Sequence, residues 1–121
     1  MDQGLGDRLF NFALSSLKFL GTLPKLPETS IIRFQLAKSS TSSGANYEEA
    51  QAGSSKADFH NKVRISLKEM RESNYWLRTI KALLSGDTFT NEIDYIIDES
   101  FQLRNILGSI VTKTNLIRLK K

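Results

Sequence analysis

The sequence predicts an all-α fold, an antiparallel up-down-up-down four-helix bundle, and three observations support this prediction. Apolar side chains recur at steps of three and four residues in four segments, which is the spacing of one helix face. Short connections containing Pro, Ser or Gly separate these segments and favour antiparallel neighbours. The strict alternation of apolar and polar residues that marks a strand is missing from the sequence. The 121 residues suffice for one domain, residues 1–121, with its own core.

The first helix is expected over about residues 5–23. Its core stripe, at steps of three and four residues, is predicted to consist of Phe10, Ala13, Leu17 and Leu20. Pro24 and Pro27 follow, and both are expected to end this helix because proline cannot continue a hydrogen-bonded helix.

The second helix is expected over about residues 29–53, starting near Thr29, and it contains an ambiguous stretch. Residues 39–43 are five hydroxyl residues in a row, and Gly44 follows them, which is also the composition of a flexible linker. Length favours a helix, because a helix that stopped before residue 39 would leave its two longer partners uncovered. A kink near Gly44 would be a compromise between the two interpretations. In a continuous helix, small and hydroxyl side chains permit a close helix–helix contact, for which the candidates are Ser42, Gly44, Ala45 and Asn46.

The third helix is expected over about residues 56–84, with Ser54 or Ser55 as its N-cap and Ser85-Gly86-Asp87 at its end. Its core stripe is predicted to consist of Phe59, Val63, Leu67, Met70, Asn74 and Leu77. The fourth helix is expected over about residues 89–118, beginning near Thr88 or Thr90. Its seam is predicted to consist of Ile96, Ser100, Leu103, Leu107, Ile110, Thr114 and Ile117. Steps of three and four alternate along this seam, as in helices that cross at a shallow angle.

The charge of the chain is weakly basic, with 17 basic and 13 acidic residues and a net charge of +4. Five acids and no base fall in residues 87–99, and five bases and no acid fall in residues 104–121. Acids early and bases late complement a helix dipole, so this distribution first of all indicates a helix. The net charge alone is compatible with a nucleic-acid partner and does not require one.

Several classes of function find no support in the composition. The chain has no Cys, which excludes disulfides, thiolate metal sites and a cysteine nucleophile. His60 is the single histidine, and no His, Asp or Glu pair has convincing ligand spacing, so we expect neither a metal site, a cofactor nor a catalytic centre. No run of 18 apolar residues predicts a membrane span. We therefore expect a cytoplasmic protein that is not an enzyme.

A basic stripe on the third helix is the main candidate for a binding site. It consists of Arg64, Lys68, Arg71, Tyr75 and Arg78, at steps of four, three, four and three residues. Guanidinium and ammonium groups bind phosphates, and a tyrosine ring can stack on a base, so this stripe suits RNA or DNA. The alternative is a solvated face whose bases pair with Glu92 and Glu99 of the fourth helix. The sequence leaves both interpretations open.

A second flank of the third helix carries Ile65 and Trp76, with Glu69 and Glu72 between them. The bundle centre needs one apolar stripe per helix, so this flank either widens the core or forms an oligomer interface, where Trp is enriched. Ile65 and Trp76 are the interface candidates.

Two blocks of the sequence resemble the bacterial four-helix-bundle proteins first found as reading frames in intervening sequences of 23S ribosomal RNA genes. The first block comprises residues 35–39 and 42–50, QLAKS and SSGANYEEA. The second comprises residues 57–62, 67–69 and 72–78, ADFHNK, LKE and ESNYWLR. The resemblance extends from about residue 7 to residue 114.

This resemblance implies a four-helix bundle that assembles as a ring-shaped homopentamer and binds nucleic acid. Related accessory proteins of diversity-generating retroelements bind a reverse transcriptase and RNA or DNA, so a reverse transcriptase or another protein is a further candidate partner. The family has no established enzyme activity. We therefore expect a non-enzymatic oligomeric adaptor that binds RNA, ribosomal RNA in particular, or DNA through its third helix. The alternative is a protein–protein scaffold with no nucleic-acid role.

Overall fold

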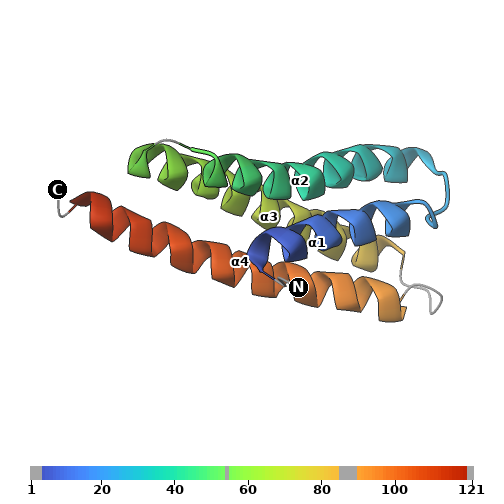
Figure 1. Ribbon diagram of the computed structural model, residues 1–121. Helices are drawn as coiled ribbons and strands as arrows, with labels where there is room; N and C mark the ends of the chain where they lie inside the picture. Colours follow the sequence, from blue (N-terminus) through green and yellow to red (C-terminus); the bar gives the residue numbers. More distant parts are fainter. Residues whose placement is uncertain (1–3, 54, 85–89, 120–121) are drawn as a thin grey trace.

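The computed structural model describes residues 4–53, 55–84 and 90–119, and this part of the chain forms four α-helices and no strand. The helices are α1 (Leu5–Leu20), α2 (Pro27–Gln51), α3 (Lys56–Leu83) and α4 (Thr90–Leu119). Successive helices run in opposite directions, with the connections at alternate ends of the bundle (Figure 1). The predicted all-α fold is confirmed.

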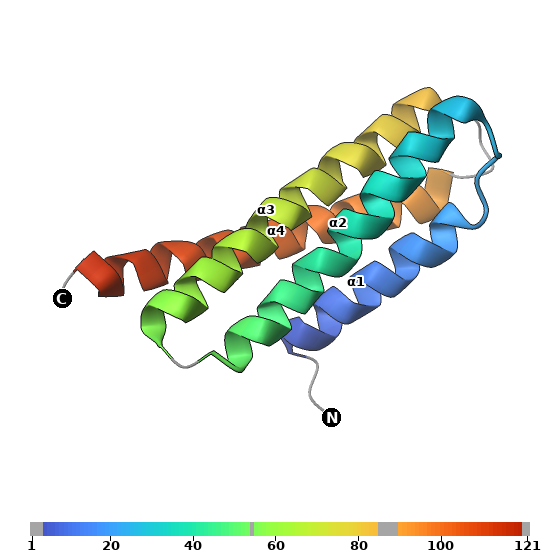
Figure 2. The same ribbon diagram turned by 90° about the horizontal axis from the view of Figure 1, so that it is seen from above.

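The four helices occupy the corners of a square. In the described residues α1 contacts α2 and α4, and α3 contacts the same two helices, so that α1 and α3 lie diagonally opposite. With 16 residues α1 is the shortest helix, and the 30 residues of α4 make it the longest. The C-terminal end of α4 projects beyond the other helices in both views (Figures 1 and 2).

The core runs along the axis of the bundle and draws on all four helices. Its most deeply buried large side chains are Leu9, Phe19, Leu36, Val63, Met70, Leu77, Ile80, Ile96, Leu103 and Leu107. The stripes predicted for the third and fourth helices contribute most of their members to this core, including the polar pair Asn74 and Ser100. The Asn74 amide donates to Ser100 Oγ at 2.8 Å, which joins α3 to α4 inside the core.

The core stripe predicted for the first helix is wrong for three of its four residues. Phe10 and Leu17 are exposed and Ala13 is half-buried, whereas Leu20 is buried as predicted. The buried face of α1 instead comprises Leu9, Phe12, Ser16, Phe19 and Leu20. This helix has apolar side chains on two adjacent faces, so spacing alone could not distinguish the core face from the outer one.

The stretch of hydroxyl residues in α2 is helical, and the helix continues through Gly44 to Gln51. Ser39 and Ser43 face α3: Ser39 Oγ lies 2.8 Å from Ser73 Oγ, and Ser43 Oγ donates to the Ser66 carbonyl oxygen at 2.9 Å. Small hydroxyl side chains therefore form a buried polar contact between the two helices. The preference for a helix over a linker is confirmed.

Pro27 begins α2 rather than only ending the preceding helix, so this helix starts two residues before the predicted Thr29. Proline is favoured in the first turn because the amide hydrogen that it lacks would have no intrahelical partner there. Thr29 Oγ1 accepts a hydrogen bond from the Leu26 amide at 3.0 Å. At the next helix, Ser55 Oγ accepts from the Asp58 amide at 3.0 Å, as expected of an N-cap. The other predicted caps, Ser54, Thr88 and the sequence Ser85-Gly86-Asp87, lie outside the described residues.

Candidate functional site

All five residues of the basic stripe on α3 are exposed, and Arg71 among them lines a hollow together with residues of α4. Arg78 Nε donates to Asn74 Oδ1 at 2.8 Å, which ties this guanidinium to the buried bond between Asn74 and Ser100. The Arg78 guanidinium lies 5.8 Å from the centre of the Tyr75 ring, and that ring is 54% exposed. The stripe therefore presents both positive charge and an open aromatic face.

The ion pairs of the described residues bear on the alternative interpretation of this stripe. They join Arg8 to Glu99 at 2.8 Å and Lys81 to Asp94 at 2.6 Å. Glu99, expected as a partner of the stripe in that interpretation, is bound instead by Arg8 of α1. The hydrogen bonding of the Arg8 guanidinium to the Glu99 carboxylate is also the main cause of the raised pKa of Arg8. Within the described part of the chain, no carboxylate pairs with Arg64, Lys68, Arg71 or Arg78.

A hollow of about 530 Å³ lies between α3 and α4 beside the stripe. Arg71 lines it from α3, and Arg104, Asn105 and Thr112 line it from α4. The Arg104 guanidinium lies 4.8 Å from the centre of the Phe101 ring, within the range of a cation–π contact. Arg104 was not predicted as a site residue, because its proximity to Arg71 follows from the packing of α3 on α4.

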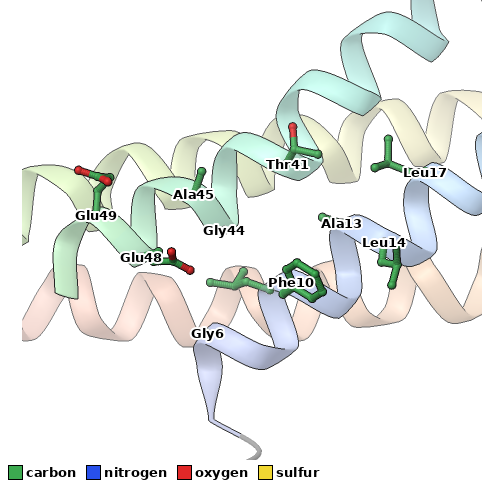
Figure 3. Close-up of a pocket in the computed structure, with 11 residues that line it drawn as sticks. Gly6, Phe10, Ala13, Leu14, Leu17, Thr41, Gly44, Ala45, Glu48 and Glu49 are labelled. Carbon is green, nitrogen blue, oxygen red and sulfur yellow. The ribbon is translucent and has the colours of Figure 1, made fainter. Parts of the chain in front are cut away.

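A second hollow, of about 400 Å³, lies between α1 and α2 on the outside of the bundle (Figure 3). Phe10, Leu14 and Leu17 line it from α1, and Thr41, Gly44 and Ala45 line it from α2, with Glu48 and Glu49 at one end. Phe10 is 67% exposed and Phe34, two turns before Thr41 on α2, is 65% exposed. We call this surface the α1/α2 apolar face.

The residues of the predicted helix-packing signature lie along α2 in different surroundings. Gly44 faces Leu9 of α1, where an added Cβ would lie 3.4 Å from the Leu9 Cβ. Ala45 is exposed, and Asn46 Nδ2 donates within its own helix to the Ser42 carbonyl oxygen at 2.9 Å. The hydrogen bonds between α2 and α3 involve Ser39 and Ser43 instead.

The two predicted interface residues differ in exposure. Ile65 is 41% exposed, whereas Trp76 is half-buried against the core and its indole donates to Glu72 Oε2 at 3.4 Å. Partial burial and the charge of Glu72 raise the pKa of Glu69 on the same flank, while Lys68 and Lys38 lower it.

His60 is buried between α3 and α4. Its Nδ1 lies 2.6 Å from Thr114 Oγ1, and that hydroxyl is 2.9 Å from the Ile110 carbonyl oxygen, to which it donates. This hydrogen bond joins the buried imidazole of α3 to α4. Nowhere in residues 4–53, 55–84 and 90–119 do three His, Asp or Glu side chains gather as metal ligands. No helix in these ranges is long and apolar enough to cross a membrane.

The comparisons with known proteins cover most of the chain. The model of a family described as 23S rRNA-intervening sequence protein matches residues 6–109. A crystal structure of a protein of unknown function from the S23 ribosomal protein family of Bacteroides thetaiotaomicron is 32% identical in sequence, with a TM-score of 0.77. The match covers 89% of this chain and 98% of that one. No protein with a curated record matches the chain.

Proposed function

The chain belongs to the family of 23S rRNA-intervening sequence proteins, and from this premise we propose that it is a non-enzymatic, oligomeric RNA-binding adaptor. The surface that we assign to RNA is the basic stripe of α3. Ribosomal RNA is the first candidate because of the family, and DNA could use the same surface because both polymers present phosphates. A cytoplasmic location, where ribosomal RNA is found, forms part of this proposal.

The observation that carries the proposal is the set of four bases without carboxylate partners on one face of α3. Bases that are already paired would have to give up those pairs before they could neutralise phosphates. Arg64, Lys68, Arg71 and Arg78 have no such pair among the described residues, so they can bind phosphate without that loss. Each neutralised phosphate releases counterions, and this release favours binding without regard to sequence. The exposed Tyr75 ring adds a surface on which an unpaired base can stack.

We propose further that copies of the chain assemble as a ring-shaped homopentamer. The α1/α2 apolar face supports self-association, because monomeric proteins rarely expose an apolar hollow whose lining includes large side chains such as Phe10, Leu14 and Leu17. Ile65 and Trp76 on α3 remain the second candidate interface. The same apolar face is the observation that favours the alternative function, a protein–protein scaffold whose partner is a reverse transcriptase or another polypeptide.

The proposed RNA binding is tested by fluorescence polarisation with a structured ribosomal RNA fragment at low salt. Changing Arg64, Lys68 and Arg71 together to Ala is expected to weaken binding by at least about a hundredfold, since each contact to a charged group contributes roughly 1.5 kcal/mol or more. The matched control changes Lys18, Lys25 and Lys38 to Ala, which removes the same charge from α1, the connection and α2. Equal losses in both variants, or no binding by the unaltered protein, would refute the proposal.

A further inference from the structure

The hollow between α3 and α4 has cationic walls from two helices. Arg71 stands on α3, and Arg104 and Gly108 follow each other by one turn on α4, with Thr112 one turn further. Leu67 and Val111 complete the lining with apolar atoms. Arg71 and Arg104 therefore border one space although they are 33 positions apart in the sequence.

The charges around this hollow favour an anion. From residue 100 onward the sequence has no Asp or Glu, and the last carboxylate before it, Glu99, is paired with Arg8 of α1. On α3, Glu69 and Glu72 belong to the opposite flank, where Glu72 binds the Trp76 indole and Lys38 of α2 acts on Glu69. Within the described residues neither Arg71 nor Arg104 takes part in an ion pair. An anion entering the hollow would thus meet positive charge without a competing carboxylate.

The shape of the hollow suits a phosphate group. A Cβ added at Gly108 would meet no atom within 4 Å, so the surface is open down to the helix backbone at this position. The Asn105 amide and the Thr112 hydroxyl can donate further hydrogen bonds from the same wall. The contact between Arg104 and the Phe101 ring restricts the guanidinium before any ligand arrives, which reduces the entropy lost on binding.

We infer that this hollow is a phosphate subsite in which Arg71 and Arg104 bind one phosphate of a nucleic-acid strand. The inference rests on the proposed RNA binding and assigns to it three residues of α4, namely Arg104, Asn105 and Thr112. A guanidinium fork matches two phosphate oxygens at once, which an ammonium group cannot do. Tyr75 stands one helical turn from Arg71 on α3, so a base next to the bound phosphate can stack on its ring. The strand therefore lies along the groove between α3 and α4.

Two variants separate charge from shape. Arg104→Ala removes one guanidinium, and Gly108→Leu keeps every charge but fills the hollow. Gly108→Leu is expected to fold, since its Cβ meets no neighbour and leucine is a better helix former than glycine. Each change should weaken RNA binding about tenfold in the polarisation assay, and Arg104→Lys should restore it only in part. Lys113→Ala, an exposed change on α4 outside the hollow, should weaken binding no more than about twofold.

Titration with inorganic pyrophosphate, followed by ¹H–¹⁵N NMR, tests the subsite without RNA. The Gly108 amide and the Arg104 Nε–H signals should shift and saturate in the unaltered protein, and the Gly108 shift should disappear in Arg104→Ala. If RNA binds but Arg104→Ala and Gly108→Leu bind it as tightly as the unaltered protein, the subsite is refuted and the proposed function stands. If pyrophosphate shifts these signals but RNA does not bind, the phosphate subsite stands. The claim that the bound phosphate belongs to a nucleic-acid strand is then refuted. If neither ligand binds, both proposals fail.

Discussion

Gly44 lies where α2 meets α1, and Leu9 of α1 packs against this position, which has no side chain. An added Cβ would lie 3.4 Å from the Leu9 Cβ and 3.6 Å from its carbonyl oxygen, which is ordinary van der Waals contact. The position has room for one methyl group and for little more. The sequence pointed to a close contact here, but the structure was needed to identify α1 as the neighbour and to measure the space.

Gly44→Ala is therefore predicted to stabilise the protein, by about 0.5–1 kcal/mol, because alanine loses less backbone entropy than glycine in a helix. Gly44→Leu should destabilise it, since a larger side chain would push α1 away from α2. Urea denaturation of both variants measures the two effects. A loss of stability in Gly44→Ala would show that the two helices leave no room for a methyl group.

Glu69 makes the stability of the protein depend on pH in a predictable direction. Partial burial first, and the charge of Glu72 second, raise the pKa of this carboxyl in the folded state. The folded state therefore binds a proton at Glu69 more readily than the unfolded state does. This contribution to stability is largest below the unfolded-state pKa, and it is lost as the pH rises through the folded-state pKa.

Glu69→Gln is predicted to be more stable than the unaltered protein at neutral pH, where the partly buried carboxylate is ionised. The advantage should shrink as the pH falls through the raised folded-state pKa of Glu69, because the unaltered carboxyl then becomes protonated. Thermal unfolding at several pH values from neutral into the acidic range measures the difference. A difference that does not change with pH, or that grows towards low pH, would contradict the assigned direction of the pKa shift.

At the scale of the helices, Arg33 of α2 closes the C-terminal end of α1. Its guanidinium donates to the carbonyl oxygens of Leu20, Leu23 and Pro24, with the bond to Pro24 at 3.1 Å. The last carbonyl groups of a helix have no partner within it, and a cation there also complements the helix dipole. One side chain thus fixes the end of α1, the connection and the first turns of α2.

Arg33→Ala is predicted to destabilise the protein by about 1–3 kcal/mol, because it removes a charged donor from three carbonyl oxygens. The carbonyl oxygens of Leu20 and Pro24 keep a second donor, the Leu23 amide and the Thr29 hydroxyl. Arg33→Lys should recover only part of the loss, since an ammonium group cannot reach three carbonyl oxygens in the same fork geometry. Lys25→Ala, an exposed change in the same connection, serves as the control and should stay within about 0.5 kcal/mol. A loss in Arg33→Ala no larger than that of the control would contradict this role.

The helices could be predicted from the sequence to different extents, for physical reasons. Continuity of α2 through its hydroxyl stretch follows from the length of its partners, although serine and glycine favour other conformations locally. The core face of α1 could not be chosen, because both of its apolar faces satisfy the helical spacing and only tertiary packing decides between them. The start of α2 at Pro27 was missed because a proline can end one helix and begin the next.

The candidate site also has a part that the sequence predicts and a part that only the packing of the helices reveals. The stripe on α3 follows from spacing within one helix, so Arg64, Lys68, Arg71 and Arg78 could be grouped without a structure. Arg104 and Gly108 join Arg71 only through the alignment of α3 against α4, which no local pattern specifies. One of the two interpretations of the stripe paired it with Glu92 and Glu99, but Glu99 binds Arg8 of α1 instead.

At the scale of the whole molecule, the exposed apolar surface predicts self-association. Light scattering at micromolar concentration should give a mass close to five times the 13.7 kDa of the chain. Phe10→Asp combined with Phe34→Asp should reduce the assembly to monomers, because each change places a charge at an exposed apolar position, one on α1 and one on α2. Ile65→Asp, on the flank of α3, is the matched comparison and should leave the mass unchanged. If Ile65→Asp gave monomers and the double Phe variant kept its mass, the interface would lie on α3. A monomeric unaltered protein would refute the assembly.

The central claim is that unpaired bases of α3 neutralise phosphates, and the salt dependence of RNA affinity tests it most directly. The logarithm of the association constant should fall linearly with the logarithm of salt concentration, with a slope of roughly −3 to −4 per bound chain if the four bases each neutralise one phosphate. Changing Arg64, Lys68 and Arg71 to Ala should flatten this slope by about 2–3, whereas the control with Lys18, Lys25 and Lys38 changed to Ala should keep it. An RNA affinity that does not depend on salt, or an equal slope in both triple variants, would contradict the claim.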